Sequence, residues 1–460
     1  MKKIEKQFQD YIQSHPEESR MSALRIQNAI LDSPLSYRIE GIESAVPFYT
    51  KTLHIPKMFS MEDKKNFQTI CSTMNSIFTK ATMAWKEDPV LQKLSGFSPE
   101  LCKLIQQDPG YRSAIPMLRV DIFYDEKTKD FRFCEFNTDG TSAMFENNTV
   151  YELLQQNNAW MHFHLDHEYM ELMDTWIDAF LLDVKEATGK EKPNIVITDI
   201  LENAYLPELL AFARAFEKSG LVCEVCDIRK LQDDGTKLCS PETGTRFDAV
   251  YRRAVTMDVM NHLEEVQPFL QAVKDNQVVL VGGFQTQVVH SKEIVSLLFS
   301  PQMRKYLTKE ECDFLDAHQP ATFDLDEQAA ERIEHDQNRW IIKPKDGYAA
   351  RGVYAGVDVP KKLWGKLVHD FVDKGYIVQE YVPHFQSVNI DLVDYDADHF
   401  QNYANLTGLY MYNGQFAGVY SRLSNAGIVS TQYNERMVPT VFLKEESLLE
   451  EVPEEELKQE

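Results

Sequence analysis

The feature that most constrains this chain is a pair of apolar segments that each carry charged side chains, between residues 118 and 137. The segments LRVDIFY and FRFCEFN are rich in β-branched and aromatic residues, and the polar run DEKTKD that separates them has the length of a hairpin loop. We therefore predict an antiparallel hairpin here, with side chains alternating between its two faces.

The register of this hairpin places polar side chains opposite one another. A loop centred on Thr128 predicts three facing pairs on one surface: Arg119 with Asn137, Asp121 with Glu135, and Phe123 with Phe133. The opposite surface, which we expect to face the core, holds Val120, Ile122, Cys134 and Phe136.

Facing carboxylates repel, so the polar surface of the hairpin requires a positive charge. Mg²⁺ takes oxygen ligands of this type and commonly uses one or two carboxylates together with water and substrate phosphates. We interpret Asp121, Glu135 and Asn137 as a candidate metal site, with Arg119 beside it to neutralise phosphate charge. The alternative is a solvated strand face with an arginine–carboxylate network.

Composition excludes several classes of protein. The chain has 460 residues, of which 43% are hydrophobic, and a formal net charge of −24, which argues against nucleic acid or an anionic membrane as a partner. No run of about 18 apolar residues could span a bilayer, and the first twenty residues lack the apolar centre of a signal peptide. We expect a cytoplasmic protein.

Pattern changes along the sequence divide the chain into five regions. We predict a mainly helical region over 1–115, the hairpin and further helices over 116–190, a small parallel α/β domain over 191–290, a region of strands and a glycine loop over 291–443, and an acidic tail over 444–460. The tail carries eight glutamates against two lysines and reads as a solvated helix or a frayed end.

Lysines mark a second group of candidate residues. In the segment VVHSKEIVSLLFS a helix is predicted to open at Ser291, and Lys292 in its first turn opposes the helix dipole unless a phosphate binds there; a lysine reaching into solvent is the alternative. In IIKPKDGYAARGVYAG, Lys343 ends an apolar strand before a loop that contains Lys345 and Gly347. Such a loop can approach phosphate through its backbone amides, or it can be an ordinary exposed hairpin loop.

Three further segments carry candidate chemistry. The residues Gln379, Glu380, Tyr381 and Val382 form a predicted hinge after an apolar strand, whose backbone could pair with an adenine edge. Arg422 lies late in an apolar strand and needs a carboxylate or a phosphate as partner. Arg252 and Arg253 in VYRRAV are either a clamp for a substrate carboxylate or members of ion pairs.

The order of these motifs resembles the synthetase domain of glutathionylspermidine synthetases and their shorter homologues, without the amidase domain. The resemblance covers roughly residues 115–440 and rests most on RVD and EFN, followed by the helix-start lysine, the Lys-Pro strand, the Gln-Glu hinge and the late SRLS arginine. It implies an α/β (α+β) chain with a circularly permuted ATP-grasp fold. In this arrangement 116–190 and 291–443 form the nucleotide-binding core, and 191–290 forms a small Rossmann-like pre-ATP-grasp domain.

The resemblance also implies roles for the candidate residues. Asp121, Glu135 and Asn137 would bind Mg²⁺, Lys292 and Lys343 would hold the phosphates of ATP, Arg119 and Arg422 would act on the transferring phosphoryl group, and Thr141 and Ser142 would contact a peptide-like substrate. The implied activity is that of an ADP-forming ligase that joins a small-molecule or peptide carboxylate to an amine. A phosphotransferase of the same fold and a non-catalytic ATP-binding regulator are the alternatives.

Overall fold

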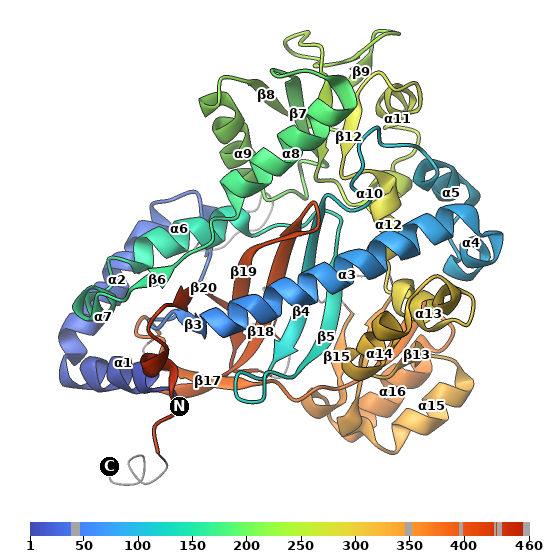
Figure 1. Cartoon of the computed structure of the whole chain (residues 1–460). Coiled ribbons are helices and arrows are strands. Elements are labelled where there is room, and N and C mark those ends of the chain that lie inside the picture. Colours follow the sequence, from blue (N-terminus) through green and yellow to red (C-terminus); the bar gives the residue numbers. More distant parts are fainter. Residues whose placement is uncertain (38–46, 346–351, 395–398, 427–428, 430–434, 454–460) are drawn as a thin grey trace.

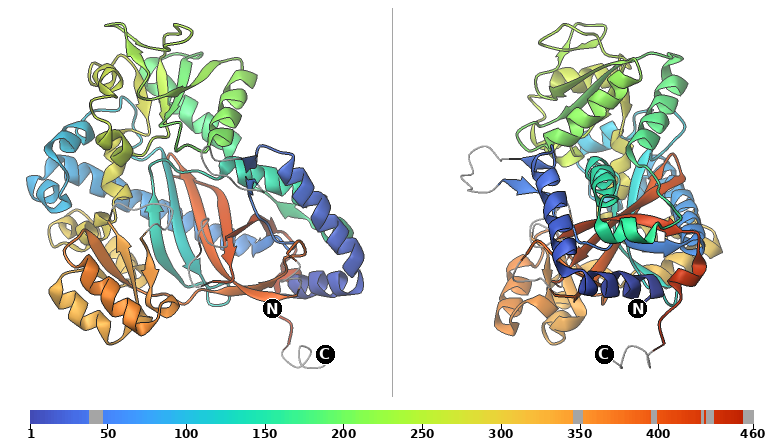
Figure 2. Two further views of the ribbon diagram at one scale, coloured as in Figure 1. Left: turned by 180° about the vertical axis from the view of Figure 1, so that it is seen from behind. Right: turned by 90° about the vertical axis from the view of Figure 1, so that its left-hand side faces the viewer.

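The computed structural model describes residues 1–37, 47–345, 352–394, 399–426, 429 and 435–453. The chain begins with helices and three short strands. These elements are α1 (Lys3–Ser14), α2 (Pro16–Leu31), β1 (Ser36–Tyr37), β2 (Phe48–Tyr49), β3 (Lys57–Ser60), α3 (Met61–Glu87), α4 (Pro89–Ser95) and α5 (Pro99–Ile105). Helices α1 and α2 lie at one end of the molecule, and the long helix α3 runs across it to α4 and α5 at the opposite end (Figures 1 and 2).

A large, mostly antiparallel sheet forms the centre of the molecule and joins segments that are about 300 residues apart. Its main path runs β3-β20-β19-β18-β4-β5, with β17 beside β18 and β6 beside β20. The strands are β4 (Met117–Tyr124), β5 (Phe131–Asn137), β6 (His167–Glu168), β17 (Gln386–Asn389), β18 (Gln401–Tyr412), β19 (Gln415–Ser424) and β20 (Arg436–Leu443). The predicted hairpin therefore forms one edge of this sheet.

The register of the β4–β5 hairpin agrees with the prediction on one side of a bulge and differs on the other. Arg119 pairs with Asn137 and Asp121 with Glu135, as expected. The register then shifts, so that Phe133 pairs with Ile122 rather than with Phe123. A β-bulge changes which face a side chain points to. Phe133 consequently lies buried in the core instead of on the polar face.

A four-stranded parallel sheet, of the type expected over 191–290, stands at one end of the molecule (Figure 1). Its strand order is β12-β11-β7-β8, and every pairing in it is parallel. The elements here are β7 (Asn194–Asp199), α9 (Leu206–Lys218), β8 (Val222–Asp227), β9 (Gln232–Asp233), β10 (Leu238–Cys239), β11 (Ala249–Arg252), α10 (Thr256–Asn261), α11 (Gln267–Lys274) and β12 (Val279–Val281). Helices α6 (Met144–Leu154), α7 (Asn158–Phe163) and α8 (Met173–Thr188) connect β5 to this sheet.

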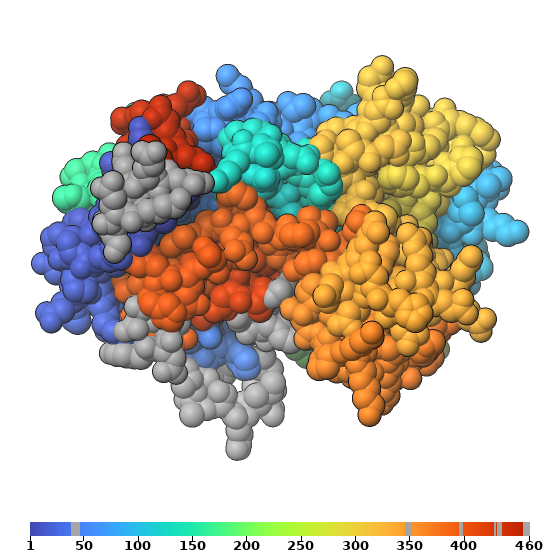
Figure 3. All heavy atoms as spheres, turned by 90° about the horizontal axis from the view of Figure 1, so that it is seen from below, coloured from blue at the N-terminus to red at the C-terminus, as the bar shows by residue number. Residues whose placement is uncertain are grey.

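A second, smaller antiparallel sheet has the order β13-β16-β14-β15 and packs its own apolar core against helices. It consists of β13 (Thr322–Asp324), α15 (Glu327–Glu334), η3 (Gln337–Arg339), β14 (Trp340–Pro344), β15 (Tyr354–Ala355), η4 (Gly356–Asp358), α16 (Lys361–Phe371) and β16 (Tyr376–Glu380). It is reached through η1 (Phe284–Thr286), α12 (Gln287–His290), α13 (Glu293–Phe299), η2 (Met303–Lys305) and α14 (Lys309–His318). Seen from below, the teal tip of the hairpin lies between this gold connecting segment and the red C-terminal segment (Figure 3).

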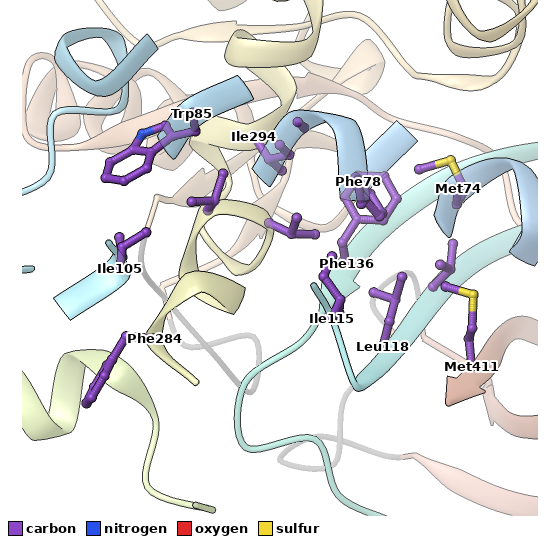
Figure 4. Close-up of a cluster of buried hydrophobic side chains, with 14 of the residues drawn as sticks. Met74, Phe78, Trp85, Ile105, Ile115, Leu118, Phe136, Phe284, Ile294 and Met411 are labelled. Atoms are coloured by element: carbon purple, nitrogen blue, oxygen red, sulfur yellow. The ribbon is translucent and has the colours of Figure 1, made fainter. Parts of the chain in front are cut away.

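The long helix α3 fixes the hairpin from its apolar face. Helix α3 starts with a capping box, in which the Ser60 hydroxyl accepts from the Asp63 N–H and the Asp63 carboxylate accepts from the Ser60 N–H. Farther along, the ring of Phe78 lies 4.8 Å from the ring of Phe136 on β5 (Figure 4). With this face buried against α3, the alternating residues of β4 and β5 have to face the other way.

The acidic tail is described as far as residue 453, and most of this part is exposed. Its described part, 444–453, forms the short turn η6 (Glu446–Leu449) and then meets the N-terminus, where the Val452 N–H donates to the Met1 carbonyl at 3.0 Å. Glu450 forms an ion pair with Lys3. Opposite charges at the two ends of the chain thus hold this segment in place. None of the helices in the described residues is both long and apolar enough to cross a membrane.

Candidate functional site

The centre of the site is Asp121, a fully buried carboxylate that contacts two arginines. Arg119 donates to it through Nε at 2.8 Å and through NH2 at 3.1 Å, and Arg422 donates through NH2 to Oδ2. Strand β18, which lies between β4 and β19, permits this contact because its residue opposite Asp121 is Gly408, which has no side chain. A Cβ at Gly408 would lie only 2.8 Å from Asp121 Oδ1 and 2.9 Å from Arg119 Cδ. The partner that the sequence required for Arg422 is therefore Asp121.

Glu135 faces Asp121 across the hairpin, and the amide of Asn137 connects the two carboxylates. Asn137 Nδ2 lies 3.2 Å from Asp121 Oδ2 and 3.3 Å from Glu135 Oε1. Burial alone would raise the pKa of Glu135, but the charges of Lys292, Arg422, Lys343 and Arg119 outweigh it and lower that pKa to about 2. Glu135 is thus an ionised carboxylate surrounded by cations.

A cleft with a cavity volume of about 60 Å³ begins at Glu135 and extends between the large and small sheets. Its walls come from β5, α12 and α13, β14 and β16, and its polar lining residues are Cys134, Glu135, Asn137, His290, Ser291, Lys292, Gln319, Lys343, Lys345 and Gln379. The cleft thus brings together six of the predicted site residues from four segments of the chain.

Lys343 and Gln379 form the floor of the cleft on the small sheet. Both are buried on adjacent antiparallel strands, and Lys343 Nζ donates to Gln379 Oε1 at 2.7 Å. Gln379 Nε2 in turn donates to Thr322 Oγ1 at 3.2 Å. The sequence predicts a backbone role for Gln379 as a hinge residue. In the structure its side chain accepts a hydrogen bond from Lys343 and so orients the lysine ammonium.

The other three hinge residues lie outside the lining of this cleft. The backbone N–H groups of Glu380 and Tyr381 already donate to the carbonyls of Ala321 and Arg339, at 2.8 and 2.7 Å. The Glu380 side chain forms an ion pair with Arg339 at 3.1 Å. Pairing of these two amides with an adenine edge would require them to exchange partners, and a role for Val382 remains a prediction.

Lys292 and Lys345 are linked through the backbone at the mouth of the cleft. Helix α13 begins at Glu293, so Lys292 occupies the N-cap rather than the predicted first turn, and its N–H donates to the Lys345 carbonyl at 3.3 Å. The ammonium of Lys345 forms ion pairs with Glu293 and, at 3.0 Å, with Asp324. Its charge is therefore neutralised within the protein. Gly347 lies outside the described residues.

Thr141 and Ser142 follow β5 and lie on the other side of the arginine cluster. The Ser142 carbonyl accepts from Arg119 NH1 at 3.4 Å and from the Tyr410 hydroxyl. The Thr141 carbonyl accepts from Arg253 NH1 at 2.6 Å. The backbone of this predicted substrate loop is thus held by arginines, and its side-chain roles stay predictions.

The alternatives for the double arginine of β11 are resolved in favour of ion pairs. Arg252 pairs with Asp139 and Arg253 with Glu208, each at 2.8 Å, and all four side chains are buried. The Arg252–Asp139 pair ties the segment after β5 to the parallel sheet, and the Arg253–Glu208 pair joins the end of β11 to α9.

Sequence reasoning missed His290 and Gln319 as lining residues of the cleft, because neither belongs to a motif with recognisable spacing. It also assigned Cys134 to the core face, whereas the bulge brings Cys134 to the cleft. Burial raises the pKa of the Cys134 thiol to about 11, so it stays protonated at neutral pH and is a poor nucleophile.

The carboxylate and amide oxygens around Glu135 are of the type that binds Mg²⁺. They differ from the expected site because Asp121 is already in contact with two arginines. The described residues contain no group of three or more His, Cys, Asp or Glu side chains that could hold a metal ion. Two carboxylates and one amide are nonetheless a sufficient protein contribution for an ion that keeps waters and phosphate oxygens as ligands. Because two guanidiniums already contact Asp121, Glu135 is the more accessible carboxylate of the pair.

Comparison with known proteins identifies the fold of the chain. No protein-family model and no curated protein matches the chain. Among solved structures, a glutathione synthetase-like effector from Globodera pallida, in apo form, matches with a TM-score of 0.58 and 11% identity over 92% of this chain and 97% of that chain. A putative gamma-glutamylcysteine synthetase from Methylobacillus flagellatus has a TM-score of 0.41 and 11% identity over 80% of this chain and 88% of its own. With its two antiparallel sheets, the intervening cleft and the parallel α/β domain, this chain has an ATP-grasp fold.

Proposed function

We propose that this protein is an ATP-dependent ligase that joins a carboxylate to an amine through an acyl-phosphate intermediate. The observation that carries the proposal is the convergence of Arg119, Arg422, Lys343 and Lys292 on Glu135 at a cleft between two antiparallel sheets. The described fold, which resembles that of a glutathione synthetase-like effector, supports an amide-forming synthetase and leaves the substrates open.

The net positive charge of this cluster is complementary to the net negative charge of a magnesium nucleotide. Four cations surround Glu135, and Asp121 is the second carboxylate of the cluster, so two positive charges are in excess. Mg²⁺ bound to ATP has a net charge of about −2, and phosphoryl transfer depends mainly on positioning and on neutralising charge of this kind. Binding the magnesium nucleotide would therefore balance the cluster.

Each residue has a chemical task in this proposal. Lys343, oriented by Gln379, and Lys292 hold phosphate oxygens of ATP at the floor and mouth of the cleft. Arg422 and Arg119 stabilise the charge that develops as the γ-phosphoryl group leaves ADP and bonds to the substrate carboxylate. The amine then attacks the acyl carbon, the C–O bond to phosphate breaks, and the amine loses a proton.

Glu135, Asn137 and Asp121 are the residues available to hold Mg²⁺, which would neutralise phosphate charge during transfer. The protein contribution is to keep these oxygens on one strand pair and to shield them from bulk water. A specificity of the glutathionylspermidine type, with a peptide carboxylate and a polyamine, is the finer form of this proposal and rests on the sequence resemblance of residues 115–440.

The proposal is tested by incubating the protein with Mg-ATP and pooled small carboxylates and amines, followed by mass spectrometry. We expect ADP and a product whose mass equals that of an acid plus an amine minus water. A control is Lys343→Ala, which should form less of both at subsaturating ATP because it binds ATP more weakly. ATP conversion to AMP, or a phosphorylated acid as the final product, would contradict the ligase assignment.

A further inference from the structure

Beyond the nucleotide cleft, one carboxylate beside the arginine cluster has no cationic partner among the described residues. Glu146 on α6 accepts hydrogen bonds from the Tyr420 hydroxyl and, at 3.2 Å, from Thr50 Oγ1. In the described chain, no cation is among its partners. The neighbouring charged groups that act on it are Glu435 and Glu208, both carboxylates. Burial and these two carboxylates raise the pKa of Glu146 to about 7, so a cation bound beside it would favour its ionised form.

Tyr420 connects Glu146 to the residues proposed to act on the phosphoryl group. The guanidinium carbons of Arg119 and Arg422 lie over its ring, 5.6 and 5.4 Å from the centroid. Its hydroxyl reaches both Glu146 and Glu435, the latter at 3.1 Å. One hydroxyl has one proton to donate, so it serves only one of these carboxylates at a time. The arginines thus lie over the ring of Tyr420, and Glu146 lies at its hydroxyl.

Two unpartnered groups beside this cluster also indicate a missing ligand. Arg422 is 8% exposed, and within the described residues its Nε has no hydrogen-bond partner, although its NH2 nitrogen contacts Asp121. The buried hydroxyl of Tyr205 is unpartnered as well, and the charge of Glu146, after burial, helps to raise its pKa. A guanidinium with a free N–H needs an anion, whereas Glu146 needs a cation. Both groups are satisfied if an activated carboxylate and an ammonium bind side by side.

We propose that Glu146 binds the ammonium group of the amine substrate, next to the arginines that hold the activated carboxylate. Tyr420 donates its hydroxyl to Glu146, and Tyr205 lies close enough for the charge of Glu146 to act on its hydroxyl. The inference rests on the proposed ligase function and narrows its second substrate to primary amines that are charged in solution. Glu146 is thereby a specificity-determining residue of the reaction.

The test is isothermal titration of wild-type protein, Glu146→Gln and Glu146→Asp with ethylamine, ethanolamine and putrescine, in the presence of Mg²⁺ and a non-hydrolysable ATP analogue. The uncharged control ligand is 1,4-butanediol. We expect Glu146→Gln to weaken binding of the amines by about 10- to 100-fold, as befits loss of a charged hydrogen bond. Glu146→Asp, which keeps the charge, should recover most of this loss. The matched control Glu152→Gln, on the exposed face of the same helix, should bind like wild type.

The outcomes separate the two proposals. If the nucleotide analogue binds but the wild-type protein binds none of the three amines, or if Glu146→Gln binds them as tightly as wild type, the amine site is refuted and the ligase proposal stands. If the nucleotide analogue itself fails to bind, the ligase proposal fails. Nucleotide binding by Glu146→Gln also shows that this variant is folded.

Discussion

Replacing Asp121 with Asn tests whether the carboxylate holds the arginine cluster together. Asp121 is fully buried, and Arg119 and Arg422, which are each 8% exposed, both donate to it. The Asn side chain keeps the size of Asp but removes the charge, which leaves two guanidiniums buried side by side. Removing one partner of a buried ion pair costs about 3–5 kcal/mol, and we expect a loss in this range.

A double-mutant cycle makes this prediction specific. Arg422→Met alone leaves Asp121 paired with Arg119 and should cost about 1–2 kcal/mol. In the Asp121→Asn background the same change removes one of two repelling cations, so it should restore stability rather than reduce it further. The free energy of unfolding is measured by urea titration, followed by tryptophan fluorescence and by far-ultraviolet circular dichroism to check that both probes agree.

Two results would refute this reasoning. If Asp121→Asn unfolds at the wild-type urea concentration, the carboxylate does not stabilise the arginines. If the costs of Asp121→Asn and Arg422→Met simply add in the double variant, the two side chains are not coupled as the hydrogen bonds indicate.

The remaining predictions address the cleft and one buried carboxyl group. Arg422→Ala should slow ADP formation by about 10²–10³-fold with little change in ATP affinity, as measured by steady-state kinetics. Arg422→Lys should recover only part of this rate. Near-normal turnover of Arg422→Ala would show that Arg422 takes no part in the reaction. Lys343→Ala should weaken ATP binding by about tenfold or more in calorimetry, whereas unchanged affinity would exclude a phosphate contact. Glu135→Gln should raise the Mg²⁺ concentration needed for half-maximal nucleotide binding by about tenfold or more, and an unchanged midpoint would contradict the metal assignment. Burial raises the pKa of Asp183 to about 7 from its usual 3.8, so ionisation disfavours the folded state above pH 7 and not below pH 4. Asp183→Asn should therefore stabilise the protein at pH 8 by about 2–4 kcal/mol and have little effect at pH 4, and equal effects at both pH values in urea titrations would contradict the shift.

Local patterns in the sequence predicted much of the fold. The alternation in LRVDIFY and FRFCEFN predicted the hairpin, and the alternating strands and helices after residue 191 predicted the parallel sheet. The Asn-Gly pair at 413–414 forms the β18–β19 turn, where both residues have the positive φ that this dipeptide favours. These features are set by side-chain period and turn chemistry within a few residues, which is why sequence reasoning could find them.

Features that depend on tertiary contacts could not be predicted. The bulge after Asp121 moves Phe133 into the core and Cys134 to the cleft, and no local pattern marks it. Arg422 reaches Asp121 across a gap in β18 that exists because residue 408 is Gly, a contact between residues 301 positions apart. Lys345 carries the charge expected of a phosphate-binding group, yet its partners Glu293 and Asp324 come from separate segments.

The central claim is that a carboxylate is activated as an acyl phosphate, and ¹⁸O transfer tests this claim most directly. A carboxylate substrate labelled with ¹⁸O in both oxygens is incubated with the protein, Mg-ATP and the amine, and the released phosphate is examined by ³¹P NMR and mass spectrometry. The account predicts ADP and inorganic phosphate carrying one ¹⁸O atom, with the second ¹⁸O retained in the amide. Recovery of ¹⁸O in AMP, or of unlabelled phosphate together with a labelled amide, would contradict it.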